Sequence, residues 1–170
     1  GIYAVVIHPA GASLLFLGVL YFWHIPRYFD LTVLHDSWDD FAHVTMLVTG
    51  VWFWWMILDP RRRPGRVSFG LRLLVLGITV VPNSLLGAYL TFIHADLYTA
   101  YDQVGRWWGL SALTDQQLAG LILWIPGAMM YFIALLVVLW LWRRDELGVG
   151  ATEAVKAPPA AAFSEFTASS

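Results

Sequence analysis

The stretch that decides the fold is "HDSWDDFAHVTMLVTGVWFWWMIL", residues 35–58, in which two histidines and three aspartates precede an almost unbroken apolar run. The apolar part is close to the roughly 20 residues that a helix needs to cross a bilayer. The polar cluster before it marks either the place where a membrane helix emerges into water or a functional site. The stretch therefore predicts a transmembrane helix with a polar mouth at one membrane surface.

The composition of the whole chain agrees with a membrane protein. Of 170 residues, 59% are hydrophobic and only 13% are charged, with ten Trp, ten Phe and seven Tyr. So little polar surface cannot cover a soluble globule. We expect an all-α polytopic membrane protein with one transmembrane domain, residues 1–147, folded as a four-helix bundle. Its spans are predicted at about 3–24, 38–58, 69–93 and 118–142. Pro82 and Pro126 fall mid-span and predict kinks in the third and fourth helices.

Basic residues predict the orientation. They gather in the connection between the second and third spans and after the fourth, at Arg61, Arg62, Arg63, Arg66, Arg143 and Arg144. Short loops rich in Lys and Arg stay in the cytoplasm. We therefore expect a bacterial-type inner (cytoplasmic) membrane protein with both ends cytoplasmic. Residues 148–170, rich in Ala, Ser and Pro, are predicted to be a disordered cytoplasmic tail.

Local patterns add expectations about single residues. Ser37 with Asp40, and Thr114 with Gln117, have the spacing of a capping box at the outer mouth of a span. Arg72, about one turn into the third span, is expected to extend towards the inner surface. Asn83, beside Pro82, is expected to hold helices together.

Histidines predict a metal site at the outer end of the bundle. Four of the five lie on that side, and Asp39, Asp40 and Met46 stand four or three residues from His43, a spacing that shares a helix face. The chain has no cysteine, so thiolate sites are excluded, while imidazole with Met or carboxylate suits copper. The candidate metal ligands are His24, His35, His43, His94, Asp39, Asp40 and Met46.

Structural roles for the same residues stay open. Asp39 and Asp40 suit the first turn of a helix, where carboxylates meet free N–H groups. His43 suits a hydrogen bond to a neighbouring helix. The other histidines suit loop, interface or helix-end positions. No nucleophile motif or phosphate-binding loop is present, so we do not expect an enzyme, and haem is a minority interpretation.

Three motifs together resemble a known family. They are "WHIP" at 23–26, the His43 helix ending in "FWW" at 53–55, and "GLSALTDQQLAGLILWIPG" at 109–127. Over about residues 8–145 the chain resembles the C-terminal half of the CtaG-like cytochrome c oxidase assembly factors. The resemblance implies an inner-membrane protein that helps to mature a haem-copper oxidase, with His24, His35 and His43 as copper ligands. Family members usually have more spans, and an acidic residue at the position of Ala42.

Two functions follow as hypotheses. The first is a membrane assembly factor that binds or hands over copper on the extracytoplasmic side, with oxidase subunits and the lipid bilayer as partners and no nucleic acid. The alternative is a structural or accessory subunit of a larger respiratory or copper-enzyme complex, without a metal of its own.

Overall fold

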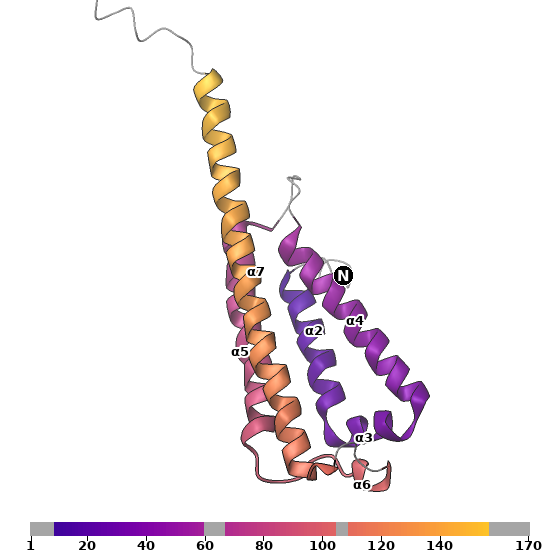
Figure 1. The fold of residues 1–170 in the computed structure, drawn as a ribbon. Helices are drawn as coiled ribbons and strands as arrows, with labels where there is room; N and C mark the ends of the chain where they lie inside the picture. Colours follow the sequence, from indigo (N-terminus) through magenta and orange to yellow (C-terminus); the bar gives the residue numbers. More distant parts are fainter. Residues whose placement is uncertain (1–8, 60–66, 105–108, 157–170) are drawn as a thin grey trace, which may run out of the picture.

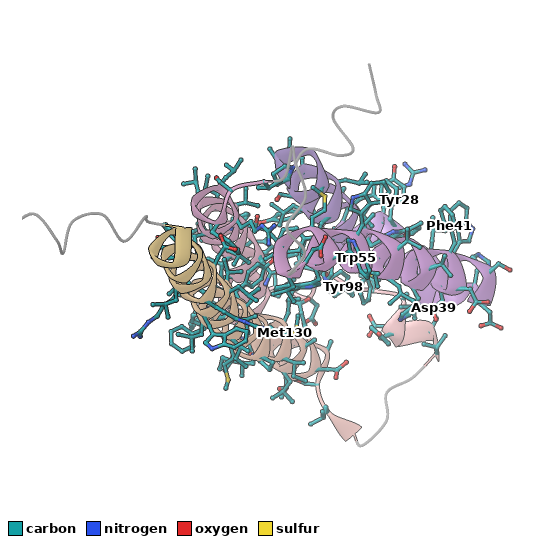
Figure 2. The ribbon with its side chains drawn as sticks, turned by 90° about the horizontal axis from the view of Figure 1, so that it is seen from above. Tyr28, Asp39, Phe41, Trp55, Tyr98 and Met130 are labelled. Atoms are coloured by element: carbon teal, nitrogen blue, oxygen red, sulfur yellow. The ribbon has the colours of Figure 1, made fainter. Side chains whose placement is uncertain are left out.

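A computed structural model describes residues 9–59, 67–104 and 109–156, and over residues 149–156 it describes the backbone alone. The described chain is all-helical, as predicted. Its elements are α2 (Pro9–His24), α3 (Pro26–Leu34), α4 (Asp36–Leu58), α5 (Phe69–Phe92), α6 (Tyr101–Val104) and α7 (Ala112–Lys156). Helices α5 and α7 lie side by side, and α2 lies beside α4 (Figure 1). The view from above in Figure 2 shows the same two pairs.

Three described helices are long and apolar enough to cross a membrane: α4, α5 and residues 112–148 of α7. Their bounds lie close to the predicted spans. A fourth span is counted only if α2 and α3, bent by 71° at their junction, form one broken span. Both helices with an internal proline, Pro82 in α5 and Pro126 in α7, continue through it as helix. The four-span bundle and the two kinks stay predictions.

The outward faces of the long helices are apolar. Leu47, Val51 and Trp55 on α4 are exposed, as are Met129 and Phe132 on α7. Apolar surface of this extent is rare on soluble monomers. In a bilayer the same faces meet lipid tails, so the exposed side chains agree with a multi-pass membrane protein.

The bend between α2 and α3 has a local cause. Pro26 has no backbone N–H, and the residue before a proline is disfavoured in helical conformation. Ile25 accordingly adopts an extended conformation, with φ −65° and ψ 125°, and Pro26 begins the next helix. Helix α2 therefore ends at His24.

The core is concentrated at the end of the bundle opposite α3 and α6. It joins the last turns of α4 to the start of α5 and the middle of α7, with Phe16 of α2 stacked on Phe53 at a ring separation of 5.1 Å. Its buried residues are Phe53, Ile57, Val75, Leu76, Tyr131, Ala134 and Val138. Towards α3 and α6, α4 leans away from α7 (Figure 1). The bundle is thus packed at one end and open at the other.

Helices α5 and α7 touch backbone to backbone at two glycines. A Cβ on Gly87 would come within 2.8 Å of the Cβ of Trp124, and one on Gly120 would come within 2.7 Å of the backbone N of Thr91. Neither distance is sterically acceptable. Small residues allow this close approach of helices within a membrane, where packing rather than water exclusion drives association.

Arg72 does not extend to the surface as expected. It is 2% exposed, and its Nη1 donates to the carbonyl oxygens of Ile57 at 3.3 Å and Asp59 at 2.8 Å, while Nε donates to Val67 O at 3.2 Å. The last carbonyls of a helix have no partner within it. Arg72 therefore caps the end of α4 and ties it to the start of α5, a contact between residues far apart in sequence.

Residues 93–100, which connect α5 to α6, are held by polar contacts. Gln116, at the start of α7, accepts from the N–H of Leu97 at 2.8 Å and donates to the carbonyl of Ala95 at 3.1 Å. The Asp30 carboxylate accepts from the N–H of Ala100 at 3.2 Å, and Tyr98 donates to His24 O at 3.1 Å. The connection is thereby fixed against α7, α3 and the end of α2.

Two helices begin earlier than the capping-box pattern predicts. Helix α4 follows His35 at its N-cap, which makes no side-chain cap bond, so Ser37 lies inside the helix. Helix α7 follows Ser111, whose Oγ accepts from Thr114 N at 3.1 Å. Helix α7 also continues to Lys156, so residues 148–156 of the predicted tail are helical. Residues 157–170 lie outside the described chain.

Gly87→Ala and Gly120→Ala are each expected to lower the stability of the bundle by about 1–3 kcal/mol, because the added methyl group forces α5 and α7 apart. The matched control is Gly77→Ala on α5, where a Cβ meets nothing within 4 Å. Thermal unfolding in detergent measures the difference. Equal midpoints for Gly87→Ala and Gly77→Ala would contradict the close contact.

Arg72→Met is expected to destabilise the protein by about 1–3 kcal/mol, because buried carbonyls of α4 lose their donor. Arg143→Met, at an exposed position, removes the same charge without removing a cap and should unfold like the parent. An Arg72→Met protein as stable as Arg143→Met would show that Arg72 does not support α4.

Candidate functional site

His24, the last residue of α2, has one ring nitrogen committed to the backbone. Its Nδ1 lies 2.7 Å from the carbonyl oxygen of Leu20. A carbonyl only accepts hydrogen bonds, so Nδ1 carries the proton. In the neutral ring, Nε2 then keeps its lone pair for a ligand.

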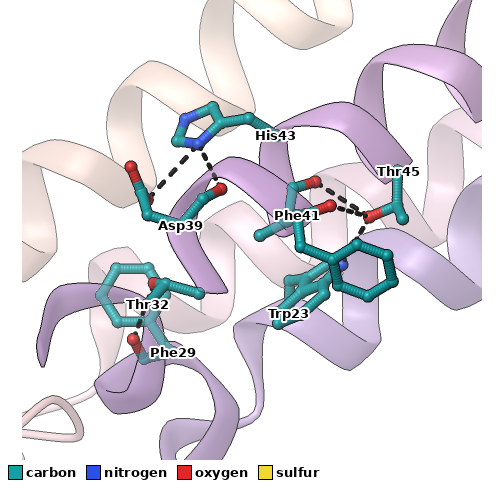
Figure 3. Close-up of polar contacts among 8 residues, drawn as sticks. Trp23, Phe29, Thr32, Asp39, Phe41, His43 and Thr45 are labelled. Carbon is teal, nitrogen blue, oxygen red and sulfur yellow. Dashed lines mark hydrogen bonds and ion pairs between the residues drawn. The ribbon is translucent and has the colours of Figure 1, made fainter. Parts of the chain in front are cut away.

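His43, in the second turn of α4, has the same arrangement. Its Nδ1 lies 2.9 Å from the carbonyl oxygen of Asp39 and 3.3 Å from Asp39 Oδ1 (Figure 3). A carboxylate behind a histidine is the usual support of a metal-binding imidazole, since it sets the tautomer and the orientation of the ring. The His43 side chain is 70% exposed, so its Nε2 is accessible.

Both histidines line one cavity of about 740 Å³ at the end of the bundle that holds α3 and α6. Met46, three residues after His43, also lines it. Two imidazoles and a thioether from α2 and α4 therefore line the same cavity. Its further lining residues include Trp23, Phe29, Asp36, Asp39, Tyr101 and Asp115.

Of the seven predicted ligands, His24, His43, Asp39 and Met46 line this cavity, whereas His35, His94 and Asp40 do not. His35 is the exposed N-cap of α4, and His94 is an exposed residue just after α5. Within the described ranges, no three His, Asp or Glu residues stand close enough together to hold one ion. This chain thus offers two imidazole nitrogens and a sulfur along a cavity wall rather than a closed cage.

The carboxylates make the cavity favourable for cations. Asp36 and Asp39 come from α4 and Asp115 from the first turn of α7, and no described lining residue is Lys or Arg. Charges of one sign that line a hollow with low-dielectric walls raise the local concentration of the opposite charge. The arrangement suits a positively charged ligand with affinity for imidazole and thioether, as copper has.

A smaller cavity of about 80 Å³ adjoins the large one. The two cavities share four lining residues: His24, Phe29, Tyr101 and Asp115. Tyr98 also lines the smaller cavity, and burial raises the pKa of its hydroxyl to about 12. The hydroxyl therefore stays protonated and keeps its bond to the carbonyl of His24.

Sequence patterns missed three residues of the cavity region: Asp36, Asp115 and Gln116. Their shared signal is a polar residue at the mouth of an apolar span, in "HDSW" and "TDQQ". The pattern suits helix capping equally well, and only the position of these residues in the walls of the two cavities separates the two roles.

Comparison with known proteins shows the relationship of the chain. The family model described as cytochrome c oxidase caa3 assembly factor (Caa3_CtaG) matches residues 1–145. An uncharacterized protein of Mycobacterium leprae is 26% identical over 150 residues, which cover 86% of this chain and 22% of the relative. A protein of Mycobacterium bovis is 26% identical over 147 residues, with the same two shares. The chain thus spans only about a fifth of these relatives. No solved structure matches significantly.

The match covers most of the chain and includes every residue of the cavity. The chain therefore belongs to the cytochrome c oxidase caa3 assembly factor family, Caa3_CtaG.

Proposed function

We propose that this protein assists the assembly of a haem-copper oxidase by holding copper in the cavity at His24 and His43. The observation that carries the proposal is the pair of Nδ1 bonds to backbone carbonyls, which leave two Nε2 atoms available in one cavity. The family description supports the assembly role. The role is non-catalytic: the chain carries an ion to the reaction centre of another protein.

The incomplete ligand set fits transfer better than storage. Two imidazoles and Met46 leave coordination positions for a recipient, and without thiolates copper is held less firmly. A carrier must release its ion, so a closed cage would oppose this function.

The cavity is proposed to face the extracytoplasmic side of a bacterial cytoplasmic membrane. It lies at the end of α2 and the beginning of α4, whereas the arginine-rich connection follows the opposite end of α4. Positive loops remain cytoplasmic. Copper would then be offered where the oxidase subunits expose their extracytoplasmic surfaces.

The proposal predicts that the purified protein binds copper and that His24→Ala with His43→Ala abolishes binding, because the cavity loses both nitrogen ligands. Loading with Cu(I) in detergent, followed by metal analysis and competition with a chromogenic chelator, measures this. Asp39→Asn is expected to weaken binding about tenfold or more, since it removes the carboxylate behind His43.

The matched controls are His35→Ala and His94→Ala, which remove the same side chain outside the cavity. Both should bind copper like the parent. Copper lost in the controls, or retained in the double variant, would overturn the site. The accessory-subunit alternative predicts a different result: no copper, and constant copurification with a large complex in mild detergent.

A further inference from the structure

The cavity is much larger than an ion. Its volume of about 740 Å³ lies in the range of sites that enclose organic ligands, about 300–1,000 Å³. His24, His43 and Met46 occupy part of its wall, and the remaining wall includes carboxylates and aromatic rings.

That remaining wall carries negative charge from two helices. Asp36 begins α4 and Asp115 lies in the first turn of α7, so the two carboxylates face the cavity from different helices. No described lining residue is Lys or Arg. The carboxylates of Asp36 and Asp115 therefore favour a positively charged occupant.

Aromatic rings complete the wall. Trp23 is buried and fixed by a bond from Nε1 to Thr45 Oγ1 at 2.9 Å, and Phe29 lies 6.2 Å from Tyr101 between ring centres. Aromatic faces attract ammonium and guanidinium groups, most strongly where water is excluded. A cavity lined by both aromatic rings and carboxylates suits Lys and Arg side chains.

We propose that this cavity is the docking site for a basic segment of a partner polypeptide, whose Lys or Arg side chains enter between the aromatic rings and the carboxylates of Asp36 and Asp115. The inference builds on the proposed assembly role, because a docked segment places the ligands of the partner beside His24 and His43. Docking itself requires no metal. A polypeptide fits better than a small amine, since it fills the volume and spans both helices.

The test uses metal-free protein in detergent and a fluorescent peptide, Gly-Lys-Gly-Lys-Gly, with norleucine replacing lysine in the comparison peptide. Anisotropy gives the affinity. Asp36→Asn with Asp115→Asn is expected to weaken lysine-peptide binding about tenfold, since both charge partners are lost. The control, Asp40→Asn with Glu146→Gln, makes the same charge change at exposed positions outside the cavity and should bind like the parent.

Three results would overturn docking. They are no binding of the lysine peptide, an equal loss of affinity for it in both double variants, or an affinity for the norleucine peptide equal to that for the lysine peptide. Free spermidine that binds as tightly as the peptide, with the same sensitivity to Asp36 and Asp115, would assign the cavity to small amines instead. The thermal unfolding midpoint of the Asp36 and Asp115 double variant in detergent checks its fold. Docking is measured without metal, and copper holding is measured with the His24 and His43 variants, so the two proposals fail independently.

Discussion

The contact between the backbones of α5 and α7 at Gly87 and Gly120 supports the rest of the structure. It sets the position of α7, and Gln116, one helical turn before Gly120, then reaches the connection after α5. That connection carries Tyr98, which bonds to the carbonyl of His24. The end of α2, and with it one candidate ligand, is thus positioned through a series of contacts that begins where two glycines permit helices to touch.

The two ends of the bundle differ in how closely their helices pack. At one end, aromatic and aliphatic residues fill the core and Arg72 satisfies the carbonyls of α4, as backbone groups must be satisfied where water is scarce. At the other end, Pro26 turns the chain into α3, and α4 leans away from α7 (Figure 1). The cavity is the result, and ionisable residues of α2, α4 and α7 line it.

Sequence patterns predicted the long helices well, because apolar runs of bilayer length have few alternative folds. They also predicted that His24 and His43 lie on one side, since helix length and direction determine that. Contacts between residues on different helices were not predictable. Arg72 donates hydrogen bonds to the carbonyls of Ile57 and Asp59, and Asp115 lines a cavity formed mainly by α2, α3 and α4. Periodicity also could not show that His35, near His43 in sequence, lies outside the cavity.

The central claim is that His24 and His43 both keep Nδ1 protonated and Nε2 available. Nitrogen-15 NMR of histidine-labelled, metal-free protein measures this most directly, because protonated and unprotonated ring nitrogens differ widely in chemical shift. The account predicts the Nδ1–H tautomer for both residues in the neutral ring, with the Nε2 signals shifting when Cu(I) is added. The Nε2–H tautomer at either residue, or Nε2 chemical shifts that do not change when Cu(I) is added, would contradict the account.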